Sequence, residues 1–259
     1  MMIAKGVVFL DISSKENLEF ARYHFSAIDS TNTWAKNNTH LFDPSKITLV
    51  TAYSQSAGRG RSSRQWKSPA KQNIYASFCF VMPKESPNLS NITQIMAISV
   101  LETLDSIGFK AKVKWPNDLL LSGKKVGGIL CEILNQRGLI WVILGIGINI
   151  NMPQELLQTI DQPATSLLVE SGTPLEIGMI TQKLQKHFVR NLKIFLEKGF
   201  SPFLSDYKAK LVHSPQQLLH FKQDDQEWEG VFHSINDDGS LSLKLESGEI
   251  KKIFSGEIT

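Results

Sequence analysis

Residues 110–134 read KAKVKWPNDLLLSGKKVGGILCEIL, and this stretch contains the pattern that decides the fold. The run from Lys110 to Leu121 is typical of a strand, and Trp115-Pro116-Asn117-Asp118 interrupts it because proline cannot donate to a strand ladder. Ser122-Gly123 is a tight-turn signal, and a further strand is expected from Lys125 to Leu134. The pattern therefore predicts strands joined by short turns, with the polar residues of the interruption presented at a strand end.

Strand and helix signals alternate on both sides of this stretch. Strands are expected at residues 3–10, 47–53, 73–82 (half-buried) and 139–149. Helices are expected to begin at Ser30 and to span residues 89–107 and 174–197, with a loop at residues 54–72. Four short strands with turn signals between them are expected at residues 218–221, 228–235, 241–245 and 250–254. This change of pattern predicts a domain boundary near residues 207–214.

Composition excludes several classes of protein. With 42% hydrophobic and 20% charged residues among 259, the chain is neither disordered nor collagen-like. The longest apolar run, Leu139–Ile148, is too short for a membrane helix, and the first ten residues lack a signal peptide. Cys79 and Cys131 make no disulfide framework. We therefore expect a folded cytoplasmic protein that does not insert into a membrane.

The charge distribution is more informative than the net charge of +3. No acidic residue lies between Asp43 and Glu85, and at the centre of this segment stands Gly58-Arg59-Gly60-Arg61-Ser62-Ser63-Arg64-Gln65-Trp66. Glycines let a backbone approach a ligand closely, and arginines offer forked donors to carboxylate or phosphate. The segment predicts a loop that receives an anion, and a solvated face is the alternative.

Three further segments hold candidate functional residues. Asn117 with Asp118 suits a hydrated Mg²⁺ or a nucleobase edge, although Pro-Asn-Asp is also an ordinary turn. In the segment from Lys124 to Leu130, lysine beside paired glycines can meet an anion, or it is simply the end of a hairpin. Alternating Gly and Ile from Gly145 to Asn151 leaves a flat strand face, which either a ligand or a packed helix can occupy. The six histidines show no metal-ligand spacing.

The order of these segments carries a resemblance. Ser30-Thr31-Asn32, then Gln55 with the Gly-Arg loop, Lys-Trp-Pro-Asn-Asp, Lys-Val-Gly-Gly-Ile-Leu and Gly-Ile-Gly-Ile-Asn resemble the biotin–protein ligases over most of residues 28–259. The resemblance implies an α+β fold, with a mixed, mainly antiparallel sheet and helices on one side, as in class II aminoacyl-tRNA synthetases. It also implies a catalytic domain at residues 1–207 and a small SH3-like β-barrel at residues 208–259.

The implied activity joins biotin to ATP and passes the biotinyl group from biotinyl-5′-AMP to a lysine of the biotin carboxyl carrier domain of acetyl-CoA carboxylase. Its ligands would be biotin, ATP and Mg²⁺. By resemblance, the biotin-binding residues would be Ser30, Thr31, Asn32, Gln55, Arg59, Gly60, Arg61, Trp115, Lys125, Gly127, Gly145 and Gly147. The ATP-binding residues would be Arg61, Arg64, Trp66, Lys114, Asn117, Asp118, Lys125 and Asn149. The catalytic residues would be Arg61, Lys125 and Asp118, and Asp118 would also hold the metal.

This chemistry needs cations more than a base. A carboxylate is already ionised at neutral pH, so attack on the α-phosphorus requires alignment and charge stabilisation. The acceptor lysine must lose a proton, for which Asp118 is a candidate. Many relatives carry Arg-Arg-Gly where this chain has Arg61-Ser62-Ser63, which affects loop closure and any dimer that depends on the loop.

Other functions stay open at the level of sequence. Lipoate or octanoate ligases share the fold but lack the Gly-Arg loop and the Lys-Trp-Pro-Asn pattern. A nucleic-acid-binding module or a scaffold that binds a carrier domain without chemistry would also fit a basic loop and a small barrel. Only 29 residues precede Ser30, so we expect no winged helix and no DNA binding. A homodimer is left open.

Overall fold

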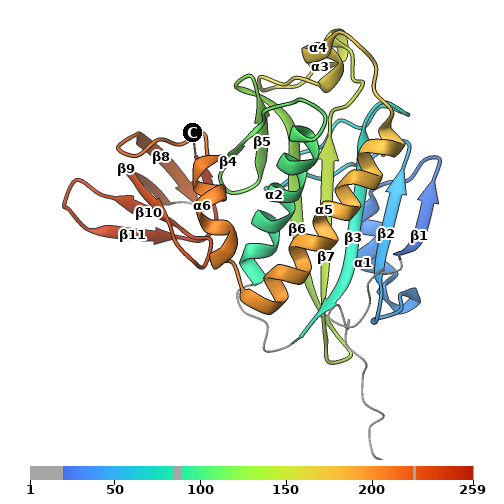
Figure 1. The fold of residues 1–259 in the computed structure, drawn as a ribbon, viewed down its shortest axis with the longest axis horizontal. Coiled ribbons are helices and arrows are strands. Elements are labelled where there is room, and N and C mark those ends of the chain that lie inside the picture. The colour runs from blue at the N-terminus through green and yellow to red at the C-terminus, as the bar shows by residue number, and fades with distance from the viewer. Residues whose placement is uncertain (1–19, 84–88, 224–225, 259) are drawn as a thin grey trace, which may run out of the picture. The chain divides into compact units, whose positions relative to one another are not determined.

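The computed structural model describes residues 20–83, 89–223 and 226–258. The expected strand at residues 3–10 lies outside the described residues. The chain divides into two compact units, each described by itself below. The first holds the described residues up to Pro83 together with Leu130–Ile150, and the second holds the remainder. Strand β6 (Lys124–Gln136) contributes to both units (Figure 1).

The first unit is built on a sheet with the order β1-β2-β3-β7-β6. Its other strands are β1 (Phe20–Phe25), β2 (Ile47–Ala52), β3 (Ile74–Met82) and β7 (Leu139–Ile148). Strand β1 runs parallel to β2, whereas the β2–β3 and β3–β7 pairs are antiparallel. Helix α1 (Thr31–Asn37) packs against β2, β3 and β7, and a short 3-10 helix, η1 (Thr39–Leu41), follows it.

Strand β3 differs from the half-buried strand that its alternating pattern predicts, because all nine of its residues are buried. It lies between β2 and β7 in the sheet, so its backbone is paired on both sides. Strands covered on both faces are apolar at nearly every position. Ser77 is therefore exceptional, since it places a hydroxyl in the middle of this buried strand. Around β3 the unit buries a cluster of seven residues: Ala35, Phe42, Val50, Cys79, Val81, Trp141 and Ile143.

The second unit combines a hairpin, a set of helices and a second sheet. The first part of β6 pairs with β5 (Asp118–Leu121), which pairs with β4 (Lys112–Lys114). The helices are η2 (Leu89–Asn91), α2 (Ile92–Asp105), α3 (Gln154–Leu157), α4 (Leu167–Ser171), α5 (Ile177–Lys198) and α6 (Ser201–Ala209). The strands of the second sheet are β8 (Leu218–Gln223), β9 (Gln226–Ile235), β10 (Leu241–Lys244), β11 (Ile250–Ile253) and β12 (Glu257–Ile258), in the order β11-β10-β9-β8-β12.

Strands β4 and β5 form a hairpin, whereas the sequence predicts one interrupted strand from Lys110 to Leu121. Strands β4 and β5 are antiparallel, with Lys114 opposite Asp118, so the chain reverses at the interruption itself. The Trp115-Pro116 peptide bond in this turn is cis. The next turn is confirmed, because Ser122 and Gly123 both have positive φ, at 51° and 77°. The interruption is therefore a corner, in which Trp115 is buried and Pro116, Asn117 and Asp118 are partly buried.

The long helix of the second unit follows its predicted pattern. Helix α5 buries Ile180, Leu184, Phe188, Leu192 and Phe195 along one face and packs against α2. It ends at Gly199, whose φ of 68° and ψ of −160° form a backbone conformation that glycine adopts more readily than other residues. The short elements β1, α3, α4, α6 and β12 have no counterpart in the sequence prediction. The expected boundary near residues 207–214 stays a prediction.

Trp115 lies in the core of the second unit and is 1% exposed. Its indole Nε1 donates to the Gly239 carbonyl at 3.0 Å, and its ring lies 6.0 Å from that of Phe221. Gln94 Nε2 of α2 donates to the same carbonyl at 3.2 Å, and Ser90 Oγ donates to the Asp238 carbonyl at 3.1 Å. The β9–β10 turn is therefore fixed to α2 and to the β4–β5 corner.

His213 makes the second unit sensitive to acid. Burial, with a smaller contribution from the charge of Lys114, lowers the pKa of His213 from 6.5 to about 4. Neither ring nitrogen has a hydrogen-bond partner among the described residues. Below pH 6.5 the unfolded chain therefore binds a proton at this histidine, whereas the folded chain does not until the pH nears 4. As a result, the contribution of neutral His213 to the free energy of unfolding is complete above pH 6.5 and falls as the pH drops toward 4.

Between pH 7 and pH 5 the wild-type protein should lose about 2 kcal/mol of unfolding free energy through His213, because pH 5 lies about 1.5 units below the pKa of the unfolded histidine. The His213→Leu variant should not show this loss. Urea titrations at the two pH values measure this difference. His233→Leu, at an exposed histidine of β9, is the control and should keep the wild-type acid sensitivity. Equal sensitivity in all three proteins would contradict the assignment.

Within residues 20–83, 89–223 and 226–258, no helix has both the length and the apolar composition that crossing a membrane requires.

Candidate functional site

The start of α1 brings the first group of predicted residues together. Ser30 is the N-cap, and its Oγ accepts from the Thr33 backbone N–H at 3.4 Å. The Thr31 backbone N–H donates to Gln55 Oε1 at 2.8 Å, and Thr31 Oγ1 lies 3.2 Å from the same oxygen. Ser30, Thr31 and Asn32 are all buried. Hydroxyl and amide groups, able to donate and to accept, thus converge at one helix N-terminus.

Ser77 joins this group, although no sequence motif includes it. Its Oγ lies within hydrogen-bond distance of Asn32 Oδ1 and 2.9 Å from Thr31 Oγ1. Its side chain is fully buried in β3. A serine within an apolar strand is a readable signal, because a buried hydroxyl needs a partner.

Glu132, on β6, is the second residue in contact with this group that no sequence motif predicts. Its carboxylate accepts from Arg59 NH1 at 3.0 Å, from Lys36 Nζ at 3.2 Å and from Asn32 Nδ2 at 3.2 Å. Burial acts to raise the pKa of Glu132, but the Lys36 hydrogen bond, the charge of Arg59 and the Asn32 hydrogen bond together lower it. Glu132 is therefore an ionised, acceptor-only group at neutral pH.

The Gly-Arg loop is folded into a small hairpin. The Gly60 N–H donates to the Arg64 carbonyl at 2.7 Å, and the Trp66 N–H donates to the Gly58 carbonyl at 2.9 Å. Ser62 and Ser63 form its tip with φ of 51° and 60°, in the left-handed region that glycine tolerates better. Gly58 is required, because a Cβ there would lie 2.6 Å from the Trp66 carbonyl. The loop therefore has a defined conformation.

Gly145 and Gly147 on β7 leave space for two side chains of the first unit. A Cβ on Gly145 would lie within 3.0 Å of the Asn32 amide, and a Cβ on Gly147 would lie within 2.8 Å of the Trp66 ring. Close packing thus accounts for both glycines, and a ligand on this face stays a prediction. Beyond them, Asn149 Oδ1 accepts from Asn73 Nδ2 at 3.4 Å.

The second unit holds the remaining predicted residues. Lys125 Nζ and Asp118 Oδ1 form an ion pair at 2.8 Å, with the two side chains 14% and 22% exposed. Asn117 Nδ2 donates to the Ile129 carbonyl at 2.9 Å, and the Ile129 N–H returns a bond to the Asn117 carbonyl at 3.0 Å. Strand pairing places Gly127 opposite Leu119. The interruption and the Lys-Val-Gly-Gly segment are thereby held next to each other.

The backbone of Lys125 is fixed on its other edge. Its N–H donates to the Pro163 carbonyl at 2.9 Å, and its carbonyl accepts from the Thr165 N–H at 2.9 Å. Lys114, at the end of β4, is half-buried. Trp115 belongs to the core described above, and its expected contact with biotin stays a prediction.

Metal-binding geometry is limited to a single carboxylate. No group of three or more His, Cys, Asp or Glu side chains that could hold an ion occurs in the described parts of the chain. Asp118, beside Asn117, offers one carboxylate, of which one oxygen pairs with Lys125, and Mg²⁺ commonly combines one carboxylate with phosphate and water oxygens; the metal role of Asp118 stays a prediction.

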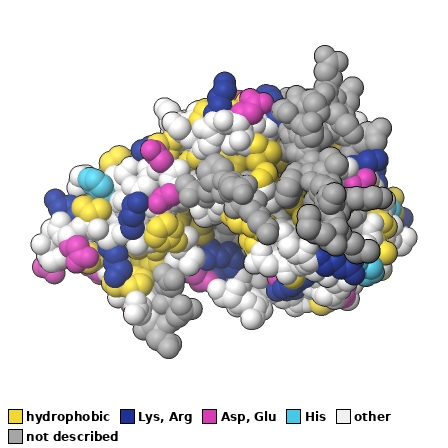
Figure 2. Space-filling model, turned by 90° about the horizontal axis from the view of Figure 1, so that it is seen from below, with side chains coloured by type: hydrophobic (Ala, Val, Ile, Leu, Met, Phe, Trp, Pro, Cys, Tyr) yellow, Lys and Arg dark blue, Asp and Glu magenta, His cyan; other side chains and the backbone are white. Residues whose placement is uncertain are grey.

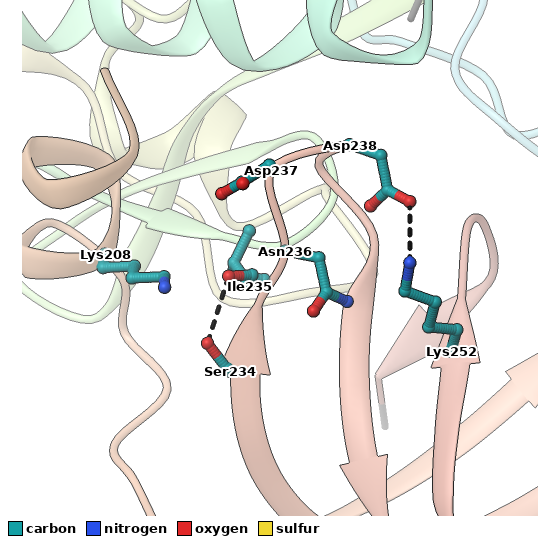
Figure 3. A pocket seen from close by; sticks show the side chains of 7 residues that line it. All are labelled: Lys208, Ser234, Ile235, Asn236, Asp237, Asp238 and Lys252. Atoms are coloured by element: carbon teal, nitrogen blue, oxygen red, sulfur yellow. Dashed lines mark hydrogen bonds and ion pairs between the residues drawn. The ribbon is translucent and has the colours of Figure 1, made fainter. Parts of the chain in front are cut away.

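The second unit also contains a pocket of about 440 Å³ outside the predicted site. Figure 3 shows Lys208 reaching toward it from α6, and Asp238 paired with Lys252 at 3.1 Å. The residues that line the pocket are Lys208, Ser234, Ile235, Asn236, Asp237, Asp238 and Lys252. None of them is a predicted site residue.

Comparison with known proteins identifies the family. Residues 24–149 match the Biotin/lipoate A/B protein ligase family. Over 236 residues the chain is 33% identical to the bifunctional ligase/repressor BirA of Salmonella typhimurium, which covers 90% of this chain and 72% of that protein. The chain belongs to the biotin/lipoate A/B protein ligase family. It is also 28% identical to the biotin–[acetyl-CoA-carboxylase] ligase of Paracoccus denitrificans, over 77% of this chain and 85% of that protein.

Solved ligase structures agree. The biotin protein ligase from Aquifex aeolicus in complex with biotin and ATP matches with a TM-score of 0.77 and 30% identity, over 92% of this chain and 97% of that chain. The expected α+β ligase fold with a mainly antiparallel sheet is thereby confirmed, as is the small all-β sheet at the C-terminus.

Proposed function

We propose that this chain attaches biotin to a lysine of a biotin carboxyl carrier domain, with ATP as the activating substrate and biotinyl-5′-AMP as the intermediate. The observation that carries the proposal is the convergence of Thr31, Asn32, Gln55 and Ser77 in a chain that is similar to a ligase solved with biotin and ATP. The named relatives are biotin ligases, so a lipoate or octanoate ligase is not favoured.

The buried hydroxyl and amide group of the first unit suits the head of biotin. A ureido ring offers two N–H donors and one carbonyl acceptor, and hydroxyl and carboxamide side chains supply the complement of each. We assign Ser30, Thr31 and Gln55 to this head group. Arg59, Gly60 and Arg61 then contact the carboxylate end of biotin and the adenylate.

The ion pair of the second unit suits the nucleotide. We assign Lys125 to the carboxylate and α-phosphate oxygens, and Asn117 and Asp118 to the nucleotide and its Mg²⁺. The metal, when bound, neutralises phosphate charge. Asn149, Arg64, Lys114 and Trp66 remain assigned to ATP as predictions.

The first reaction needs no base. The biotin carboxylate attacks the α-phosphorus of ATP, a phosphorus–oxygen bond forms, and pyrophosphate leaves with the electrons of the broken bond. Arg61 and Lys125 align the two anions and stabilise the negative charge on the phosphorus oxygens. In the second reaction the lysine amine attacks the acyl carbon and AMP leaves. The proton lost by the amine goes to Asp118 in our assignment, and the ion pair with Lys125 uses one oxygen of that carboxylate.

Exchange of ³²P-pyrophosphate into ATP tests the proposal directly. Purified protein should catalyse exchange that depends on biotin, and adding a biotin carboxyl carrier domain should yield a biotinylated lysine. Exchange driven by lipoate or octanoate but not by biotin would overturn the assignment of substrate.

Arg61→Gly should weaken retention of the intermediate, because removing the guanidinium takes a charge-assisted hydrogen bond from the adenylate. We expect roughly tenfold faster release of biotinyl-AMP, equivalent to about 1.4 kcal/mol, measured by chasing labelled adenylate from the protein. Arg137→Gly is the control, since Arg137 occupies the β6–β7 turn with φ of 51° and glycine fits there without strain. Wild-type retention in Arg61→Gly would contradict a loop that clamps the intermediate.

A nucleic-acid module has little support. On the face that Figure 2 shows, basic and acidic side chains are interspersed. A homodimer remains compatible with this function.

A further inference from the structure

Glu132 connects the Gly-Arg loop to the group of residues at the start of α1. Its side chain is 15% exposed, and it contacts cations from two segments and an amide from one of them. Exposed ion pairs contribute little to stability, but a half-buried carboxylate with three donors is held in one geometry. These donors belong to segments that carry predicted biotin-binding residues.

The ionised carboxylate fixes the orientation of Asn32. Because Glu132 only accepts, Asn32 must present Nδ2 to it, and Asn32 Nδ2 also donates to the Leu130 carbonyl at 3.2 Å. Asn32 Oδ1 therefore faces Ser77, whose hydroxyl donates to it. Thr31 Oγ1 lies 2.9 Å from the same Ser77 hydroxyl and 3.2 Å from Gln55 Oε1, so the three side chains form one connected group with Asn32.

The same chain of contacts reaches Gln55. The Thr31 backbone N–H holds Gln55 Oε1 at 2.8 Å, which leaves Gln55 Nε2 to donate to Ser68 Oγ at 3.0 Å. The direction in which the Asn32 amide points thus follows from the two acceptors on its Nδ2, the Leu130 carbonyl and the Glu132 carboxylate. A ligand that reads donors and acceptors in this group is sensitive to that direction.

Arg59 of the Gly-Arg loop is the second group that Glu132 holds. Its guanidinium lies 3.0 Å and 3.2 Å from the two Glu132 oxygens, whereas its side chain is 43% exposed. The loop is a small hairpin held by backbone hydrogen bonds, so an interaction that holds Arg59 also holds the first half of the loop in place. Glu132 therefore determines where the loop lies when the ligand arrives.

We propose that Glu132 is a positioning residue for biotin: its ionised carboxylate holds Arg59 of the loop and the Asn32 amide together, and so sets the position of the loop relative to the residues at the start of α1. This inference rests on the proposed function. Glu132 itself is not placed in contact with biotin, and it acts through Arg59 and Asn32.

The test is a double-mutant cycle in the exchange assay. Glu132→Gln keeps the shape of the side chain but removes the charge and introduces a donor, so KM for biotin should rise about tenfold while KM for ATP stays within about twofold. Arg59→Gln and the double variant complete the cycle. Because Glu132 acts in part through Arg59, the rise in the double variant should be clearly smaller than the product of the two single effects.

Controls separate this role from a general loss of structure. Glu227→Gln, at an exposed glutamate of β9 that pairs with Lys222, should leave both KM values unchanged. Thermal unfolding of Glu132→Gln should remain cooperative. If it does not, Glu132→Asp replaces it, since this variant keeps the charge but withdraws the carboxylate by one methylene, and it should raise KM for biotin severalfold.

Three results would overturn the inference: an unchanged KM for biotin in the folded variant, an equal rise in both KM values, or effects that multiply in the double variant. Wild-type protein that shows no biotin-dependent exchange would overturn the proposed function and this inference with it. An active wild type with an unaffected Glu132 variant would overturn only the inference.

Discussion

Replacing Lys125 with alanine is expected to slow biotin-dependent ATP–pyrophosphate exchange by about 10²- to 10³-fold, the loss seen when one preorganised donor to a developing negative charge is removed. The structure explains why another cation would not substitute. The Lys125 ammonium is held at 2.8 Å by Asp118, and its backbone is hydrogen-bonded to Pro163 and Thr165. Its position is thus defined before any substrate binds.

Stability and catalysis should separate in this variant. The Lys125–Asp118 pair is largely buried, so leaving the Asp118 carboxylate without its partner should lower the unfolding free energy by a few kcal/mol, whereas the loss of exchange should persist in protein that is still folded. Lys124→Ala is the matched control, because Lys124 precedes Lys125 on β6 and is exposed. Steady-state exchange kinetics and urea unfolding of both variants measure the two effects. Exchange within threefold of wild type in Lys125→Ala would show that another group stabilises the α-phosphate.

Gly145→Ala is expected to lower biotin affinity at least tenfold and to reduce the unfolding free energy by about 1–3 kcal/mol, the usual range for overpacking. The new methyl group would lie within 3.0 Å of three atoms of the Asn32 amide. Asn32 cannot move away without losing its bonds to Leu130, Ser77 and Glu132. Calorimetry with biotin and thermal unfolding measure the two losses.

Gly178→Ala supplies the matched control with the opposite sign. Gly178 lies in α5, and a Cβ there would meet nothing within 4 Å. Alanine in a helix is favoured over glycine by up to about 1 kcal/mol, so this variant should gain stability and keep its biotin affinity. Normal biotin binding by Gly145→Ala would mean that Asn32 is not required in its observed position.

Periodicity and turn chemistry account for most of the fold that the sequence predicts. Helix α5 and its end at Gly199 follow from a regular apolar face and a glycine cap. The β4–β5 hairpin is missed because proline at position 116 reads as a break in a strand, and a break does not say whether the chain continues or reverses. The sequence predicts β3 as half-buried because the alternation of its side chains indicates one covered face and does not show what covers the other face.

The site shows the same division. Ser30, Thr31, Asn32 and Gln55 are predicted from their motifs, and contacts in the structure join Thr31 to Gln55 and Asn32 to Ser77. Ser77 and Glu132 are missed because neither forms part of a motif: each becomes informative only when strand pairing brings it to α1. The distribution of charge along the sequence does not predict the role of Glu132, because this residue lies on a strand well after the acid-free segment whose Arg59 it pairs with.

The left-handed conformation of Ser62 and Ser63 has an entropic consequence. Two non-glycine residues have fewer backbone states available in the unfolded chain than two glycines would have, so ordering this turn removes less conformational entropy. Biotin should therefore bind with a smaller unfavourable entropy than it does to a relative whose corresponding turn contains glycine, and heat-capacity changes should report burial of the ligand more than ordering of the chain.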